Sequence, residues 1–366
     1  MTEELLYLWF GMISRMTHTV KMNVAMKYGG IRGLWNTSEE QLRDELTQAQ
    51  ADGFLEHRDA GKVAAYAEEL RRNDITYIYP GHKLYPGKLY DIPDPPMLLF
   101  AAGDVDVLAD LDPAVAVVGA RKASVYGREA ADRLSGELAA SGVTIVSGMA
   151  LGIDGMAHRA ALNVGGKTFA VLGGGADVCY PAAHKGLYND LIKRGGILSE
   201  QPPGTPPVAW HFPARNRLIS GLADVVLVME AKEKSGSLIT ADMALEQGRD
   251  IYALPGMVTE PLSCGCNRLI RQGAGILLNE EDLLEELVIK GLLKKKIAII
   301  SDTKNKIKLE TKENLVYSKL GLYPRGLDDL QRETGLTPQE VMGICVSLQL
   351  KGCIQERSKN YYVRAK

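Results

Sequence analysis

The residues best suited to chemistry lie in the stretch HFPARNRLISGL, where Arg215 and Arg217 flank Asn216 shortly after Phe212. Two guanidinium groups and one amide can hold phosphate oxygens and base edges at the same time. A solvated helix start would carry charged residues too. The meaning of the stretch therefore depends on the elements that position it and on the donors they bring beside it.

Short apolar, β-branched runs alternate with helical patterns from about residue 110 to residue 290. This alternation predicts a mainly parallel sheet covered by helices on both faces, an α/β fold of the doubly wound, Rossmann-like kind. Ligands of such sheets bind beyond the carboxyl ends of the strands. The loops expected at that edge are rich in glycine, serine and cations: Gly119 and Arg121, Ser147 and Gly148, Gly173 and Gly174 with Lys185, and Ser235 and Ser237.

These loops favour an anion over a dinucleotide. Glycine-rich turns and helix N-termini present backbone N–H groups to anions, and Asp154 could cap the helix that follows Gly152. Arg121 occupies the position where a dinucleotide-binding fingerprint has its second glycine, and no acid follows the strand VTIVSG to hold a ribose. Tyr180 suits stacking on a base and filling its own loop equally well.

Signals for catalysis or metal binding are weak. Asp154 and His158 stand one helical turn apart, but no nucleophile lies at motif spacing from them. Cys264 and Cys266 do not make a four-ligand spacing, and we interpret them as ordinary loop thiols. We expect no catalytic residue, no cofactor and no metal.

The composition of the whole chain limits the number of domains and the kind of protein to expect. With 366 residues, 46% of them hydrophobic, the chain can fill two or three domains. A net charge of -2 gives no global nucleic-acid signature, so any anion site must be a local concentration of donors. Five cysteines and an N-terminal apolar run without a basic region or bilayer-spanning length predict a soluble, cytoplasmic protein.

Five regions follow one another along the chain. We expect a helical domain over 1–80, an extended connector packed on the core over 81–109, the Rossmann-like domain over 110–290, a lysine-rich linker over 291–312 and a winged helix over 313–366. The linker is either a solvated tether, the reading we favour, or a basic tail with nonspecific phosphate affinity. The helix from Pro338 to Gln349, which follows a capping box at Thr337, contains no arginine or lysine. We therefore favour a protein-interaction role for that last domain.

Several stretches together resemble the DNA processing protein A family, also called Smf, the bacterial single-stranded DNA-binding recombination mediators. In family order they are VGARKASVYG, SGMALGIDGMAH, VLGGGADVCYPAAHKGLY, GGILSEQPPG, FPARNRLISGL, SGSLITADMALEQGRDIYALPG and GCNRLIRQGA, and the resemblance covers nearly the whole chain. It implies a sterile-alpha-motif-like N-terminal domain, an extended Rossmann fold and a C-terminal winged helix. It also implies a homodimer that binds and protects single-stranded DNA and helps load the RecA recombinase during natural transformation.

Carried over by position, the resemblance implies that Arg121, Lys185, Asn216 and Arg217 grip the phosphates of a single strand. The other loop residues named above, with Phe212 and Arg215, complete the expected DNA site. Expected residues of the dimer and recombinase interface are Leu238, Met243, Leu245, Leu269 and Ile270. Two departures from the family pattern, GCN and FAAGD, do not touch the expected DNA site.

Two other classes of function remain open. Glu200 and Glu230, at the ends of predicted strands, could serve an enzyme that hydrolyses nucleotides or releases phosphoribose on a Rossmann-like fold. The chain could also be a scaffolding adaptor whose pocket has lost its ligand.

Overall fold

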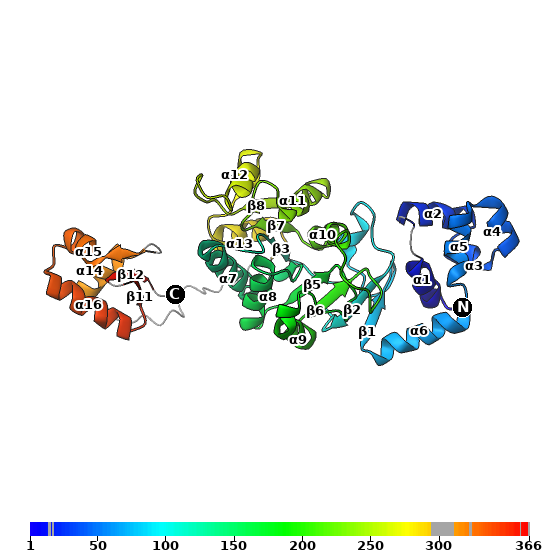
Figure 1. Ribbon diagram of the computed structural model, residues 1–366, viewed down its shortest axis with the longest axis horizontal. Helices are drawn as coiled ribbons and strands as arrows, with labels where there is room; N and C mark the ends of the chain where they lie inside the picture. The colour runs from blue at the N-terminus through cyan, green and yellow to red at the C-terminus, as the bar shows by residue number, and fades with distance from the viewer. Residues whose placement is uncertain (14–15, 17, 294–310, 322–323, 359, 365–366) are drawn as a thin grey trace. The chain divides into compact units, whose positions relative to one another are not determined.

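The computed structural model describes residues 1–13, 16, 18–293, 311–321, 324–358 and 360–364 (Figure 1). The chain divides into two compact units, residues 1–294 and residues 295–366. Most of the lysine-rich segment expected as a linker lies outside the described residues.

A nine-stranded sheet organises the first unit, with strand order β1-β2-β6-β5-β4-β3-β7-β8-β9. Seven of these strands, β3 to β9, run parallel, as the buried β-branched runs predict. Their bounds are β1 Ile75–Ile78, β2 Leu99–Gly103, β3 Ala114–Val118, β4 Thr144–Ser147, β5 Thr168–Leu172, β6 Gly196–Ser199, β7 Val225–Val228, β8 Asp250–Ala253 and β9 Gly275–Ile276.

The strand order reverses beside β3. From β3 the chain moves outward through β4, β5 and β6, then returns to place β7 on the other side of β3 and continues through β8 and β9. Ala116 of β3 accordingly pairs with Val146 on one side and Val226 on the other. The loops after β3 and β7 leave neighbouring strands for opposite faces of the sheet, which is the place where doubly wound sheets open a crevice.

Helices cover both faces of the parallel strands (Figure 1). Leu134 of α7, Ala157 of α8 and Leu287 of α13 pack in one apolar cluster, while Leu218 of α10 and Ala241 of α11 belong to another. The bounds are α7 Val125–Ala140, α8 Ile153–Asn163, η2 Ala182–His184, α9 Lys185–Arg194, α10 His211–Gly221, α11 Gly236–Glu246, α12 Cys264–Arg271 and α13 Glu280–Ile289. The predicted Rossmann-like, doubly wound fold is confirmed.

The N-terminal region is helical, and Trp9, Phe10 and Phe54 are fully buried in its core. Its helices are α1 Glu3–Met12, α2 His18–Lys27, α3 Ile31–Asn36, α4 Glu39–Glu45, α5 Gln48–Glu56 and α6 Ala60–Arg72, and a 3₁₀ turn, η1 Gly87–Tyr90, follows later.

Two strands lie where the sequence predicted a helical domain and an extended connector. β1 falls within 1–80 and β2 within 81–109, and both join the sheet antiparallel: β1 pairs with β2, and β2 pairs with β6. Four of the five residues of β2 are buried. A strand buried on both faces shows no period-2 alternation of apolar and polar residues. The sequence interpretation of this segment therefore rested on its prolines, which indicate an extended connector.

The second unit is a winged helix with its own core, which includes Val316, Leu330, Val341 and Leu348. Its elements are α14 Thr311–Lys319, β10 Arg325–Gly326, α15 Leu327–Thr334, α16 Pro338–Leu350, β11 Ile354–Ser358 and β12 Tyr361–Arg364, with strand order β10-β12-β11. The predicted capping box is present at the start of α16, where Thr337 and Glu340 exchange bonds.

Within the described part of the chain, no helix combines the length and the apolar character needed to cross a membrane.

Candidate nucleic-acid interface

A pocket opens beyond the carboxyl ends of β4 and β5. Six of the residues predicted from the sequence line it, namely Arg121, Gly148, Gly173, Gly174, Phe212 and Arg215. The rest of the lining is mostly apolar: Ala150, Leu151, Leu172, Val178, Tyr180, Pro181 and Pro207. The fold thus brings together loops that are up to about a hundred residues apart in sequence, at the edge where such sheets bind ligands.

Arg215 forms the floor of this pocket and is only 8% exposed. Its Nη1 donates to the carbonyl of Gly148 at 3.1 Å and to the carbonyl of Val171. A Cβ on Gly148 would lie 2.6 Å from Nη2 of Arg215, so only glycine admits the guanidinium here. Burial lowers the pKa of Arg215 to about 10, against the opposing effect of Asp154, so the group stays cationic at neutral pH.

Asp154 does not cap α8, contrary to the sequence prediction. The cap position is Gly152, at φ +78°, and Asp154 lies inside the first turn with its side chain buried. Its carboxylate accepts a bond from the N–H of Gly148 at 3.2 Å. Burial raises the pKa of Asp154, while the nearby Arg215 opposes that rise. The carboxylate therefore fixes the Gly148 loop from below the pocket.

The pocket wall is aromatic and its rim is cationic. The rings of Phe212 and Tyr180 lie 5.6 Å apart between centroids, and Tyr180 is 45% exposed. The exposed guanidinium of Arg121 lies 5.7 Å from the centroid of Phe212, within the range of a cation–π contact. A Cβ on Gly173 would lie 3.0 Å from the Phe212 ring, so this glycine permits the ring to close the wall.

Several predicted site residues have other partners within the protein. The hydroxyl of Ser147 donates to the carbonyl of Val117 at 2.5 Å, and Nζ of Lys185 lies over the Tyr188 ring at 4.9 Å. Gly119 faces Ile153, to which an added Cβ would come within 2.7 Å. Asn216 accepts a bond from Nε of Arg215 at 3.3 Å.

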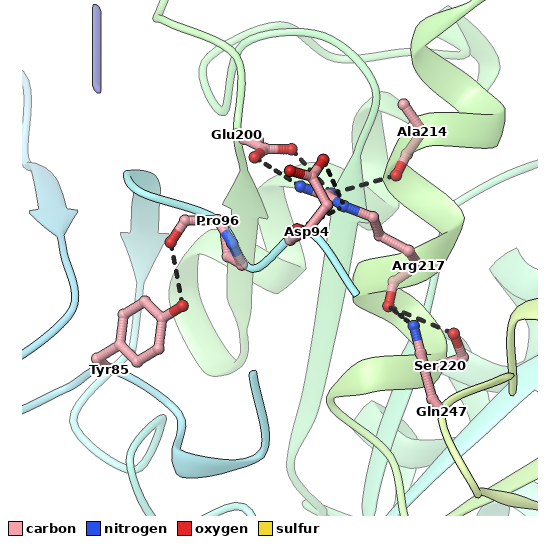
Figure 2. Close-up of polar contacts among 8 residues, drawn as sticks. All are labelled: Tyr85, Asp94, Pro96, Glu200, Ala214, Arg217, Ser220 and Gln247. Carbon is pink, nitrogen blue, oxygen red and sulfur yellow. Dashed lines mark hydrogen bonds and ion pairs between the residues drawn. The ribbon is translucent and has the colours of Figure 1, made fainter. Parts of the chain in front are cut away.

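Arg217 is not among the residues that line the pocket, and its guanidinium lies beside Glu200 and Asp94 (Figure 2). Its Nη1 and Nη2 donate to the two carboxylate oxygens of Glu200 at 2.9 and 2.8 Å, and its Nε donates to the carbonyl of Asp94 at 3.0 Å. The side chain is only 13% exposed. The bidentate pair links α10 to the end of β6, and the bond to Asp94 links α10 to the segment before β2. The structure thus gives Arg217 partners inside the protein where the sequence suggested a phosphate.

The candidate acids of the alternative hydrolase also have partners. Glu200 is held by Arg217, and Glu230 is buried, accepting from both the N–H and the hydroxyl of Ser124. His158 is fully buried, and its Nδ1 lies 2.7 Å from the hydroxyl of Thr168. Burial lowers the pKa of His158 to about 3. Cys264 and Cys266 lie on α12 rather than in a loop, and the described residues include no cluster suited to hold a metal.

The predicted interface residues differ in accessibility. Leu238 and Leu269 are 7% and 6% exposed and belong to an apolar core of the sheet domain. Leu245 is 64% exposed, while Met243 and Ile270 are partly buried. Only the last three offer surface to a partner without a rearrangement of the core.

Comparison with known proteins identifies the family. Residues 76–288, more than half of the chain, match the family described as DNA recombination-mediator protein A. The chain belongs to this family. Residues 302–358 also match the DprA winged helix domain.

Relatives in this recombination-mediator family share sequence and structure with the chain. It is 44% identical to the DNA processing protein DprA of Bacillus subtilis over 225 residues, which are 62% of this chain and 74% of that protein. The crystal structure of DprA from Streptococcus pneumoniae has a TM-score of 0.65 and 36% identity, covering 77% of this chain and 96% of that one. A structure of DprA from Helicobacter pylori, described for its single-stranded DNA binding mode, has a TM-score of 0.54 and 32% identity over 59% of this chain and 96% of that one.

A second hollow of this recombination mediator involves residues that the sequence interpretation missed. Lys122, Lys232 and Lys234 line it together with Arg121 and Ser235, and the hydroxyl of Ser235 lies 2.8 Å from that of Ser237. The signal in the sequence was weak because glutamates alternate with the lysines in EAKEKSGS and cancel their charge. The strand order, which places the loops after β3 and β7 side by side, would have revealed it.

Proposed function

We propose that the pocket beyond β4 and β5 binds single-stranded DNA, with Arg121 holding a phosphate and Phe212 and Tyr180 contacting bases. The observation that carries this proposal is the exposed guanidinium of Arg121, which lies beside the Phe212 ring. Within the described residues, this guanidinium has no ion pair. Aromatic rings beside cations bind single strands without reading their sequence, because every base has a π-face and every phosphate a charge. Membership of the recombination-mediator family and the Helicobacter pylori structure described as binding single-stranded DNA support the same ligand.

The proposal includes the later steps of recombination. A recombination mediator of this family would act in the cytoplasm as a homodimer, protect the strand and help load the RecA recombinase during transformation. Of the predicted interface residues, Met243, Leu245 and Ile270 have the exposure that such contacts need. The lysines that line the second hollow would attract the strand before it docks.

An enzymatic role is less well supported. A hydrolase would need an acid free to exchange protons with substrate or water. Glu200 and Glu230, the candidates from the sequence, are bonded to Arg217 and Ser124. We therefore propose a binding protein without catalytic residues.

The test is fluorescence anisotropy of a labelled oligothymidine titrated with wild type, Arg121→Ala and Phe212→Ala across a salt series. For Arg121→Ala we expect weaker binding and a salt slope of log K smaller by about 0.7, as for one lost phosphate contact. For Phe212→Ala we expect a loss of about 1–3 kcal/mol with an unchanged slope, since stacking carries no counterion. Lys193→Ala, an exposed cation on α9, is the control and should change neither quantity.

Two results would contradict the assignment. If the wild-type protein does not bind oligothymidine at low salt, the proposed function is wrong. Both variants binding as tightly as the control would show that the strand lies elsewhere on the protein.

A further inference from the structure

The second hollow lies at the point where the strand order of the sheet reverses. Loops after β3 and β7 form it, closed on a third side by the segment 260–262. It is a cleft of about 360 Å³, lined by Ala120, Arg121, Lys122, Lys232, Lys234, Ser235, Glu260, Pro261 and Leu262. This is the crevice that a doubly wound sheet offers to a ligand.

Four cations line this switch-point cleft against one carboxylate, Glu260. Arg121, Lys122, Lys232 and Lys234 are all exposed, and within the described residues none of them has an ion pair or a side-chain hydrogen bond. Other cations of the same unit are neutralised by carboxylates: Lys88 pairs with Asp224, Arg133 with Glu280 and Arg159 with Asp190. An unneutralised concentration of charge in a concave site attracts an anion.

The cleft is held in shape from beneath. Glu230, at the end of β7, accepts bonds from the N–H and the hydroxyl of Ser124, and so joins the loop after β7 to the loop after β3. A Cβ on Gly127 would lie 2.3 Å from the Glu230 carboxyl carbon, so the carboxylate is wedged against α7. The cationic side chains therefore project from a fixed base.

Two features favour a polymer over a free nucleotide. The lining of the cleft contains no aromatic ring, so it offers phosphate contacts but no surface on which a base could stack. Arg121 lines both this cleft and the aromatic pocket, so the two hollows are neighbours on either side of one guanidinium. A strand leaving the pocket past Arg121 enters the cleft directly.

We propose that the switch-point cleft holds successive phosphates of the single strand whose bases occupy the aromatic pocket, through Lys122, Lys232 and Lys234. This inference rests on the proposed function and extends it. The pocket grips bases and one phosphate, and the cleft adds length-dependent, purely electrostatic affinity along the same strand.

The experiment compares two triple variants of the full chain. One removes the cleft cations by Lys122→Ala, Lys232→Ala and Lys234→Ala. The matched control removes three exposed lysines from other elements by Lys62→Ala, Lys167→Ala and Lys193→Ala, which gives the same change in net charge. Circular dichroism and thermal melting check that both are folded. Binding of labelled oligothymidines of three and of fifteen nucleotides is then measured over a salt series.

For the cleft variant we expect the salt slope of log K with the longer oligonucleotide to fall by about 2, since three phosphate contacts at about 0.7 each are lost. Its affinity at low salt should drop on the order of ten- to a hundred-fold. The trinucleotide, which fills the pocket alone, should bind both variants as it binds wild type.

Other results would overturn the inference in distinguishable ways. An unchanged slope for the longer strand, with wild type binding it well, refutes the cleft as part of the DNA path and leaves the pocket intact. If wild type and the control variant bind ATP and the cleft variant does not, while the salt slope for the longer oligonucleotide is unchanged, the cleft binds free nucleotides. If wild type binds neither oligonucleotide, the proposed function fails, and the inference fails with it.

Discussion

Arg121 and Arg217 carry the same functional group in opposite surroundings. The guanidinium of Arg121 is exposed and lies beside an aromatic ring, whereas that of Arg217 makes a bidentate pair with Glu200 and is largely buried. An arginine fork binds a carboxylate and a phosphate with the same geometry, so sequence alone cannot tell which partner it has. The neighbours supplied by the fold decide it.

For Arg217→Ala we expect a loss of stability more than a loss of DNA affinity. Removing the guanidinium leaves Glu200 partly buried without its partner, which should lower the free energy of unfolding by about 1–3 kcal/mol. Thermal melting measures the stability of the variant. Fluorescence anisotropy well below the melting temperature measures its DNA affinity, which should stay within about threefold of wild type. Intact stability with a loss of binding as large as that of Arg121→Ala would instead make Arg217 a phosphate contact.

His158 gives a pH-dependent prediction. Its pKa falls from 6.5 to about 3 through burial, so the unfolded chain binds the proton more readily than the folded one. Below about pH 6.5, stability should therefore decrease as pH falls, by up to about 1.4 kcal/mol per pH unit from this group. Urea unfolding of wild type and His158→Gln at pH 7.5 and 5.5 tests this, with the partly exposed His57→Gln as control. A stability difference between wild type and His158→Gln that does not change with pH would contradict it.

At the scale of elements, the sequence predicted the helices better than the two antiparallel strands of the sheet. The helix from Pro338 was predicted from its capping box and is found as α16. Helices also alternate with the strands between residues 110 and 290, as the sequence predicted, and α7 and α11 each have one buried and one exposed face. β2 was missed because it is buried on both faces and shows no period-2 alternation, and β1 was missed with it because β1 joins the sheet only through β2.

The site was predictable only in part, for the same reason. The glycines and arginines of the pocket stood out as residue types, and five of those named line it, together with Phe212. What the sequence could not supply was the register of the strands, which places Arg217 against Glu200 and Lys232 close to Arg121. Long-range pairing of this kind is set by tertiary packing and has no local signature.

The capping box of α16 provides a test at this scale. Thr337→Ala removes the bond to the N–H of Glu340 and should destabilise the winged helix by about 1 kcal/mol. The pKa of Glu340 is lowered to about 2 by its bond with Lys312 and by the bonds from Thr337. Titration of the Glu340 carboxyl followed by NMR should therefore show a higher pKa in Thr337→Ala. An identical titration in both proteins would mean that the box does not form.

For the molecule as a whole, the division into two compact units separates the proposed DNA site from the winged helix. All residues of the pocket and of the switch-point cleft belong to the first unit. A chain ending after residue 293 should therefore fold and bind oligothymidine within a few-fold of the full chain, as measured by anisotropy. A truncated protein that folds but binds at least tenfold more weakly would show that the second unit contributes to the grip.

The contrast between a buried floor and exposed lysines has a further consequence, for variation among related proteins. Gly148 and Arg215 are in close contact, so a side chain at position 148 would require the Arg215 guanidinium to move from its bonds to the carbonyls of Gly148 and Val171. Lys122, Lys232 and Lys234 contact no partner within the described residues, so each can be exchanged with little effect on folding. If the switch-point cleft holds DNA as proposed, exchanging these lysines should change the affinity for a strand by up to about a hundredfold while the melting temperature stays nearly constant.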